Sequence, residues 1–231
     1  MPSGQARHPE WDNSDMSKTD HLPRPALVLG STSRYRKELL QRLGTPFEVA
    51  APDVDETPQP DESPAALAPR LALAKARAVA RQFPNAVVIG SDQVADLHGQ
   101  PIGKPGNHER ATAQLRMMSG QALVFHTALA VVRHDTGFER VVDVPVRVKF
   151  RTLTDAEIET YLRAEQPYDC AGSAKSEGLG VTLLEAIESD DPTALIGLPL
   201  IQTCALLREA GWDPLVELAR VRAEHCDEAR P

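Results

Sequence analysis

The chain has 231 residues, of which 42% are hydrophobic and 25% charged, a composition typical of a soluble globular protein rather than a disordered or fibrous one. Its formal net charge of -8 argues against a protein whose main task is to bind nucleic acid, because that affinity rests on neutralisation of phosphates by Lys and Arg. Three widely separated cysteines fit neither a disulfide framework nor a zinc site, so we expect a cytoplasmic protein. We expect no membrane association either, because every long apolar stretch carries charges or ends well short of about 20 residues.

Three parts can be distinguished along the chain. Residues 1–24 are polar and lack the apolar region of a signal peptide, which predicts a disordered N-terminal extension. Residues 25–215 alternate between strand and helix patterns and are expected to form a single domain. Residues 216–231 form a charged C-terminal tail.

The predicted domain begins with a strand, a turn and a helix. Residues 26–30 are apolar and predict a strand, which a polar turn connects to a helix that ends at Gly44. A second strand at 47–51 then enters a long acidic loop at 52–64.

A longer helix and a strongly apolar strand follow. The helix at 63–82 carries its apolar residues on one side, and Pro64 favours its start. The run at 86–90 is so uniformly apolar that it predicts a strand covered on both faces. Ser91 and Asp92 then stand at the carboxyl end of this strand, where α/β enzymes place metal ligands and bases, although an aspartate there can equally cap a turn.

The second half continues the same alternation. Further helices are predicted at 107–118, 154–165 and 199–209, strands at 123–134 and 139–150, and a glycine-rich segment at 171–181. The two strands flank a glycine turn and should pair as a hairpin, and Thr154 with Glu157 forms a capping box at a helix start. The whole pattern predicts an α/β fold, with a ligand crevice between the first strand–helix turn and the end of the strand at 86–90.

The turn at 31–37 combines hydroxyls, backbone N–H groups and cations at the start of a helix. A helix start favours an anion, so this turn could hold a triphosphate. Taken alone, the segment is better explained by Ser33 acting as a helix cap and the arginines facing solvent, because no Walker or dinucleotide glycine pattern is present.

Carboxylates and lysines elsewhere complete a set that could release pyrophosphate. Asp53, Asp55 and Glu56 lie in the acidic loop, and Lys75 and Lys104 could balance phosphate charge, although each group alone is typical of a solvated surface. A magnesium ion held by one or two carboxylates and the substrate would polarise the α-phosphate, while a carboxylate activates or orients the attacking water.

Six short blocks occur in an order and spacing typical of one family: LGSTSRYRKELL at 29–40, DVDE at 53–56, AKA at 74–76, IGSDQ at 89–93, GKP at 103–105 and AGS at 171–173. With these blocks the chain resembles the Maf family of nucleotide pyrophosphatases over residues 26–212. The resemblance implies that family's α/β fold, related to the inosine triphosphate pyrophosphatases, with a mixed sheet, flanking helices and a nucleotide cleft between two lobes. It also implies a divalent metal cofactor, Mg²⁺ or Mn²⁺, a nucleoside triphosphate substrate and a homodimer.

The resemblance also assigns roles to individual residues. Asp92 takes the catalytic acid–base position, Ser31, Arg36, Lys37, Lys75, Gln93 and Lys104 fall on substrate-binding positions, and Glu56 and Asp92 fall on metal-binding positions.

Within the family, the chain resembles the branch that hydrolyses 7-methyl-GTP to 7-methyl-GMP and diphosphate. Tyr35, Gln93 and Glu177 are the specificity positions that favour this branch over the dTTP/UTP branch. A carboxylate accepts hydrogen bonds from the guanine edge, and an aromatic face attracts the positive charge that N7 methylation creates. The chain departs from the family in Tyr35, which is usually Trp, and in Arg34, which is commonly Pro.

Two alternatives remain open. One is a Maf-type pyrophosphatase acting on dTTP, UTP or CTP, which turnover across a nucleotide panel would distinguish. The other is a non-catalytic nucleotide-binding protein that acts in cell division, against which the full set of catalytic positions argues. A nucleic-acid-binding module is disfavoured, because only 4% of the residues are aromatic and the charge is acidic.

Overall fold

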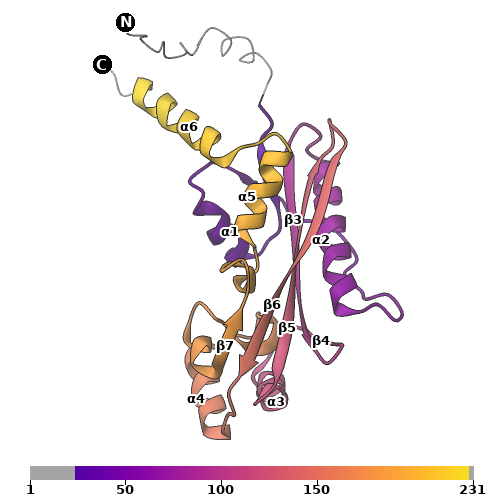
Figure 1. The fold of residues 1–231 in the computed structure, drawn as a ribbon, viewed down its shortest axis with the longest axis vertical. Coiled ribbons are helices and arrows are strands. Elements are labelled where there is room, and N and C mark those ends of the chain that lie inside the picture. The colour runs from indigo at the N-terminus through magenta and orange to yellow at the C-terminus, as the bar shows by residue number, and fades with distance from the viewer. Residues whose placement is uncertain (1–23, 229–231) are drawn as a thin grey trace, which may run out of the picture.

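The computed structural model describes residues 24–228, and these form one sheet flanked by helices (Figure 1). The predicted N-terminal extension lies outside the described residues except for its last position, and so do residues 229–231. The strands are β1 (Leu27–Gly30), β2 (Glu48–Val49), β3 (Val87–Leu97), β4 (Gln100–Ile102), β5 (Ala122–Arg133), β6 (Phe138–Phe150) and β7 (Leu184–Glu188). The helices are α1 (Arg34–Gln41), α2 (Pro64–Ala80), α3 (His108–Met118), α4 (Asp155–Glu165), α5 (Leu200–Glu209) and α6 (Pro214–Glu228), with short 3-10 helices η2 (Ala171–Ser173), η3 (Leu179–Leu183) and η4 (Ala194–Ile196).

The sheet is mixed, as expected for the family that the sequence resembles. Its strands follow the order β2-β1-β3-β5-β6-β7, and β4 pairs with the second half of β3. β1 is parallel to β2 and β3, whereas the pairs β3–β5, β5–β6 and β6–β7 are antiparallel. The predicted hairpin of β5 and β6 is confirmed, with Phe125 opposite Val146.

Helices cover both faces of the parallel part of the sheet (Figure 1). α2 packs against Val28, Val88 and Ala130 on one face. α1 and α5 pack against Leu29 and Ile89 on the other face. This double cover accounts for the uniformly apolar start of β3 and confirms that prediction.

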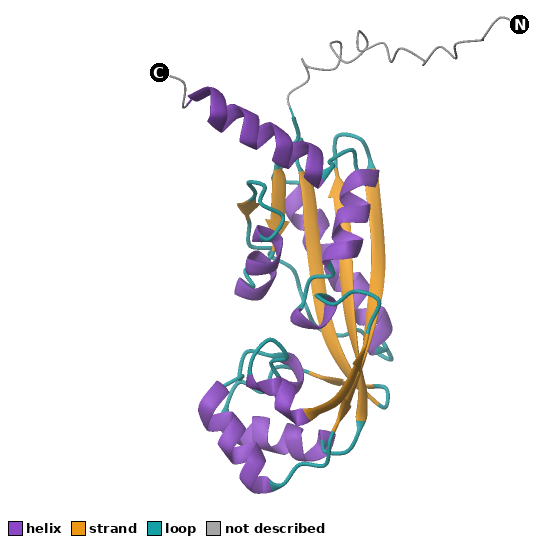
Figure 2. Cartoon of the chain, turned by 60° about the vertical axis from the view of Figure 1, so that its left-hand side comes forward, coloured by secondary structure: helices purple, strands orange, loops and turns teal. Residues whose placement is uncertain are grey.

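The far ends of the long strands form a second lobe with α3 and α4 (Figure 2). Leu115, Phe150 and Leu162 are fully buried in the core of this lobe. The capping box that begins α4 is confirmed, because Thr154 Oγ1 accepts from the Glu157 N–H and Glu157 Oε2 accepts from the Thr154 N–H. β5 and β6 run through both lobes and connect them (Figure 2).

The predicted end of β3 is wrong. The strand does not stop at Gly90 but continues to Leu97, because β5 pairs with it along almost its whole length. β1, in contrast, ends at Gly30, directly opposite Gly90. Ser91 and Asp92 therefore lie in the middle of β3, immediately beyond the point where its parallel neighbour stops, and the crevice begins there.

Among strands and α-helices, the sequence patterns missed two strands and one helix. β4 pairs with β3 across a two-residue turn in which His98 and Gly99 both have positive φ, the geometry of a tight hairpin. β7 is short, mostly exposed and placed by its pairing with β6. The segment predicted only as a charged tail is helical as far as Glu228, in α6. No helix within residues 24–228 is both long enough and apolar enough to span a membrane.

Candidate active site

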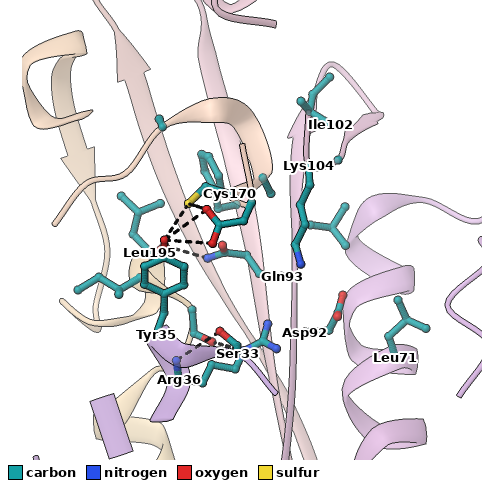
Figure 3. A pocket seen from close by; sticks show the side chains of 18 of the residues that line it. Ser33, Tyr35, Arg36, Leu71, Asp92, Gln93, Ile102, Lys104, Cys170 and Leu195 are labelled. Atoms are coloured by element: carbon teal, nitrogen blue, oxygen red, sulfur yellow. Dashed lines mark hydrogen bonds between the residues drawn. The ribbon is translucent and has the colours of Figure 1, made fainter. Parts of the chain in front are cut away.

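A cavity of about 870 Å³ lies where the two lobes meet (Figure 3). Its walls come from the β1–α1 turn, α2, the middle of β3, and the segments 169–177 and 195–197. The predicted site residues that line it are Ser31, Tyr35, Arg36, Glu56, Lys75, Asp92, Gln93, Lys104 and Glu177. Residues that are far apart in the sequence are thus gathered around one space.

The β1–α1 turn presents a helix start to this cavity. The Ser33 hydroxyl caps α1 by accepting from the Arg36 N–H at 3.5 Å. The buried Ser31 hydroxyl accepts hydrogen bonds from Ser33 N and Arg36 Nη1, both at 3.2 Å, and Arg36 Nε donates to the Gly197 carbonyl at 2.9 Å. Burial lowers the pKa of Arg36, although two carboxylates in the cavity act in the opposite direction. The turn therefore offers an anion a helix N-terminus and a cation held in place by two hydrogen bonds.

A buried lysine links two carboxylates at the same site. Lys75 Nζ lies 2.6 Å from Asp92 Oδ1 and 2.8 Å from Glu56 Oε1. Lys75 is 6% exposed and Asp92 is 8% exposed, whereas Glu56 is open to solvent. Removing one partner of the buried pair would leave the other charge buried and unpaired, which is strongly destabilising. Lys75 and Asp92 therefore stabilise each other at this position. The second oxygen of each carboxylate has no hydrogen-bond partner among the described residues and is available to a ligand.

Lys75 reaches Asp92 because α2 packs very closely against β3 at Gly90. A Cβ atom at Gly90 would lie 2.3 Å from the Ala72 carbonyl oxygen and 2.6 Å from the Ala76 nitrogen. No other residue permits this approach of the two backbones without a shift of the helix. The spacing of the ion pair is therefore set by backbone packing.

The loop that carries Glu56 is fastened to α2 by Arg70. Arg70 Nη2 donates to the Thr57 carbonyl at 3.1 Å, and the same guanidinium binds both carboxylate oxygens of Glu62, at 2.5 and 2.7 Å. These bonds lower the pKa of Glu62 to about 2. Asp55 supports the same loop by accepting from Thr57 N at 2.9 Å, and it does not line the cavity. The acidic loop is thus held in a defined conformation next to Lys75.

The amide of Gln93 has one possible orientation. Its Nε2 lies 2.9 Å from Thr127 Oγ1, 3.1 Å from the Ala194 carbonyl and 3.0 Å from the Leu195 carbonyl. Carbonyl oxygens only accept hydrogen bonds, so the nitrogen must face them. The Gln93 carbonyl oxygen, which has no hydrogen-bond partner within residues 24–228, remains to accept from a ligand.

Tyr35 stands among charged groups. Its hydroxyl accepts from Arg34 Nη2 at 2.6 Å and lies 3.4 Å from both carboxylate oxygens of Asp169. The Arg34 guanidinium carbon is 4.7 Å, and Lys175 Nζ 5.9 Å, from the centre of the ring. Burial raises the pKa of the Tyr35 phenol and raises that of the neighbouring Cys170 thiol to about 11, so both groups keep their protons near neutral pH. Two cations therefore already lie beside the ring that we expect to contact the base.

Lys104 and Glu177 reach the cavity from exposed loops, and neither forms a hydrogen bond or ion pair with the described residues. Figure 3 shows Lys104 and Asp92 directed into the same space. Lys37 is the exception among the predicted site residues, because it is exposed on α1 and does not line the cavity. Asp53 also lies outside it.

Sequence reasoning missed Asp169, Thr127 and Gly197. Asp169 stands two residues before the AGS block, so its proximity to a motif was a usable signal. Thr127 gave no signal, because a single hydroxyl within an apolar strand is common. Gly197 acts through its backbone carbonyl, which residue identity does not reveal.

The residues present fit a metal that is bound together with substrate. Within residues 24–228, no group of three or more His, Cys, Asp or Glu side chains could hold a metal ion. Glu56 and Asp92 each have one oxygen without a protein partner. Mg²⁺ commonly takes only one or two carboxylates and completes its shell with phosphates and water, so this pair is sufficient for it.

The chain is similar to known proteins over most of its length. The family model described as Maf-like protein matches residues 26–210. A 7-methyl-GTP pyrophosphatase of Polaromonas sp. is 71% identical over 199 residues, which cover 86% of this chain and 89% of that protein. Proteins with the same name from Albidiferax ferrireducens and Bordetella avium are 65% and 60% identical, over 80% and 83% of this chain and 93% and 96% of their own length.

Proposed function

Because the chain belongs to the Maf family, we propose that it hydrolyses 7-methyl-GTP to 7-methyl-GMP and diphosphate. The observation that carries this proposal is the linked set Glu56, Lys75 and Asp92, which lines the same cavity as the β1–α1 helix start. An anion site beside a buried acid is the arrangement that hydrolysis of a phosphoanhydride requires. The names of the relatives, at 60% identity and above, support the choice of substrate.

The phosphate chain is held at the β1–α1 turn. The N-terminus of α1 and the Arg36 guanidinium of the same helix supply positive charge to the cavity, and the exposed Lys104 ammonium adds to it from another loop. The Gly197 carbonyl accepts from Arg36 Nε and Ser31 accepts from Arg36 Nη1, so the guanidinium is oriented before substrate arrives. Pre-orientation reduces the entropy that binding costs.

Asp92 acts as the general base. Lys75 holds Asp92 Oδ1 by an ion pair, and the carboxylate accepts the proton of a water that attacks the α-phosphorus. The new bond forms between the water oxygen and the α-phosphorus, the bond from the α-phosphorus to the bridging oxygen breaks, and diphosphate leaves. Lys75 and Arg36 stabilise the negative charge that develops. Glu56 and Asp92 would hold Mg²⁺ or Mn²⁺, which when bound polarises the α-phosphate.

The base is recognised by acceptors on the other side of the cavity. The carboxylate of Glu177 and the outward carbonyl of Gln93 can both accept from the N1–H and the amino group of guanine. Thymine and uracil offer only one such donor, so they lose a hydrogen bond. The positive charge of 7-methylguanine is further attracted by the Glu177 carboxylate.

A broader substrate range is the second candidate, and the surroundings of Tyr35 favour it. Arg34 and Lys175 both lie near the Tyr35 ring, where they repel a cationic base. Arg34 is highly exposed and is able to swing away, at the expense of its bond to the Tyr35 hydroxyl. A Maf-type enzyme with this ring would therefore discriminate less strongly between 7-methyl-GTP and other nucleotides.

The test is diphosphate release by the purified protein from 7-methyl-GTP, GTP, dTTP, UTP and CTP, with Mg²⁺ and after chelation. We expect the highest kcat/KM for 7-methyl-GTP and loss of turnover on chelation. A preference for dTTP, UTP or CTP would keep the reaction and overturn the assignment of the base. Absence of turnover with every nucleotide would support the non-catalytic alternative.

Two further proposals concern the state of the protein in the cell. We propose a homodimer, as the family resemblance implies, which light scattering of the purified chain would test. We also propose a cytoplasmic location, which the free thiols of Cys170 and Cys204 support. Fractionation of cells that express a tagged chain would test the location.

A further inference from the structure

Glu165, the last residue of α4, has a partly buried carboxylate outside the cavity. Its side chain is only 12% exposed. Oε1 binds Lys175 Nζ at 2.8 Å, and Oε2 accepts from the Leu179 N–H at 2.8 Å. An acidic side chain at a helix C-terminus opposes the helix dipole, so its place here is explained by these contacts and not by the stability of α4.

The contacts of Glu165 bracket Glu177, one of the proposed base-reading residues. Lys175 comes two residues before Glu177, and Leu179 two residues after it. Gly178 lies so close to the Glu165 carboxylate that a Cβ at this position would be 2.6 Å from Oε2. One carboxylate therefore fixes both ends of the short segment 175–179, and the segment is built around it.

Lys175 is the group that this carboxylate has to restrain. Its ammonium lies 5.9 Å from the centre of the Tyr35 ring, on the side of the cavity where the base is expected. It forms no ion pair with Glu177 in the described structure, because Glu165 holds it. Glu165 raises the pKa of Lys175 most strongly, and Glu177 adds to the same direction, so Glu177 is within electrostatic reach of the ammonium.

We propose that Glu165 is a positioning residue for base recognition, which binds the Lys175 ammonium and thereby leaves the Glu177 carboxylate free to accept hydrogen bonds from the base. The inference rests on the proposed function, because it assigns a task to Glu177 in that reaction. Without the charge of Glu165, the ammonium of Lys175 pairs with Glu177 and neutralises the carboxylate that would accept hydrogen bonds from the base. Base recognition is then lost while the phosphate side of the cavity stays intact.

The experiment compares Glu165→Gln, Lys175→Met and the double variant. Glutamine keeps the size of the side chain and still accepts from the Leu179 N–H, but it cannot neutralise Lys175. We expect KM for 7-methyl-GTP to rise about tenfold in Glu165→Gln, the effect of one charged hydrogen bond, with kcat and the KM for UTP nearly unchanged. Lys175→Met, which leaves no ammonium to pair with Glu177 and removes one cation from beside the Tyr35 ring, should not raise the KM for 7-methyl-GTP.

The double variant separates positioning from a general effect on folding. If Glu165 acts by restraining Lys175, removal of the ammonium in Glu165→Gln/Lys175→Met restores the wild-type KM. A wild-type KM in Glu165→Gln, or an unrestored KM in the double variant, overturns the inference. Should the single variant fail to fold, an unrestored KM in the double variant still overturns the inference. Wild-type protein without a preference for 7-methyl-GTP would instead count against the proposed function, so the two failures are distinguishable.

Discussion

The two sides of the cavity are built in different ways. On the phosphate side, Ser31, Lys75 and Asp92 are all buried, and they project from a strand end, a helix and the middle of a central strand. On the base side, Glu177 is exposed and projects from a loop. The reacting groups are thus held by strands and a helix, whereas the carboxylate that reads the base stands on a loop segment held by Glu165.

This difference separates the reaction from its specificity. Groups on packed strands and helices keep a fixed geometry, which the orientation of a water and an α-phosphate requires. Residues in loops can be substituted without disturbing the core. Substrate preference can therefore change while the catalytic residues and the sheet that holds them stay the same.

The largest effect is expected from Asp92→Asn on the phosphate side. Loss of the general base should lower kcat about a thousandfold for every nucleotide, because the amide cannot accept the water proton. Steady-state diphosphate release measures it, and circular dichroism checks the fold. Asp53→Asn, an acidic-loop residue outside the cavity, is the matched control and should retain activity. Substantial turnover in Asp92→Asn would remove the basis for its role.

Gly90→Ala tests whether backbone packing sets the phosphate side. The added methyl group collides with Ala72 and Ala76 of α2, and we expect a loss of stability on the order of 1–3 kcal/mol together with lower kcat. Urea unfolding measures the change. Gly103→Ala is the control, because a Cβ there meets no atom within 4 Å. Equal stability of the two variants would show that α2 and β3 are not in close contact.

Glu177→Gln addresses the base side alone. We expect the ratio of kcat/KM for 7-methyl-GTP to that for UTP to fall about tenfold, because a charged acceptor is lost, while the stability is unchanged. Competition between the two nucleotides in one assay gives this ratio directly. Asp190→Asn is a suitable control, since Asp190 is exposed and outside the cavity. An unchanged ratio would mean that another group reads the base.

The smallest effect is expected from Glu62→Gln, which loosens the loop that carries Glu56. The pKa of Glu62 is lowered from 4.5 to about 2 by Arg70, so its contribution to stability is present above pH 4.5 and lost as the pH falls towards 2. The wild-type protein should therefore unfold at a higher urea concentration than the variant at neutral pH. This difference between the two urea midpoints should shrink below pH 4.5. Asp61→Asn serves as the neighbouring control. A difference that stays constant with pH would exclude the Glu62–Arg70 pair as its cause.

Local patterns predicted the elements whose residues carry their own signals. The capping box of Thr154 and Glu157 begins α4 as expected, and the apolar run at 86–90 is a strand with both faces covered. β7 and the second half of β3 carry no such signal, because pairing with β6 and β5 holds them in the sheet. Strand pairing is a property of two segments together, so one segment alone does not reveal it.

The sequence by itself determined the family, the α/β alternation and most of the residues that meet in the cavity, because short blocks such as 29–40 and 89–93 consist of residues typical of that family. Only the tertiary structure decided how those residues act on each other. It placed Lys75 between Glu56 and Asp92, left Lys37 outside the cavity, and set Arg34 and Asp169 around Tyr35. Such contacts depend on distances between backbones, as at Gly90, and these distances arise only when helices and strands pack.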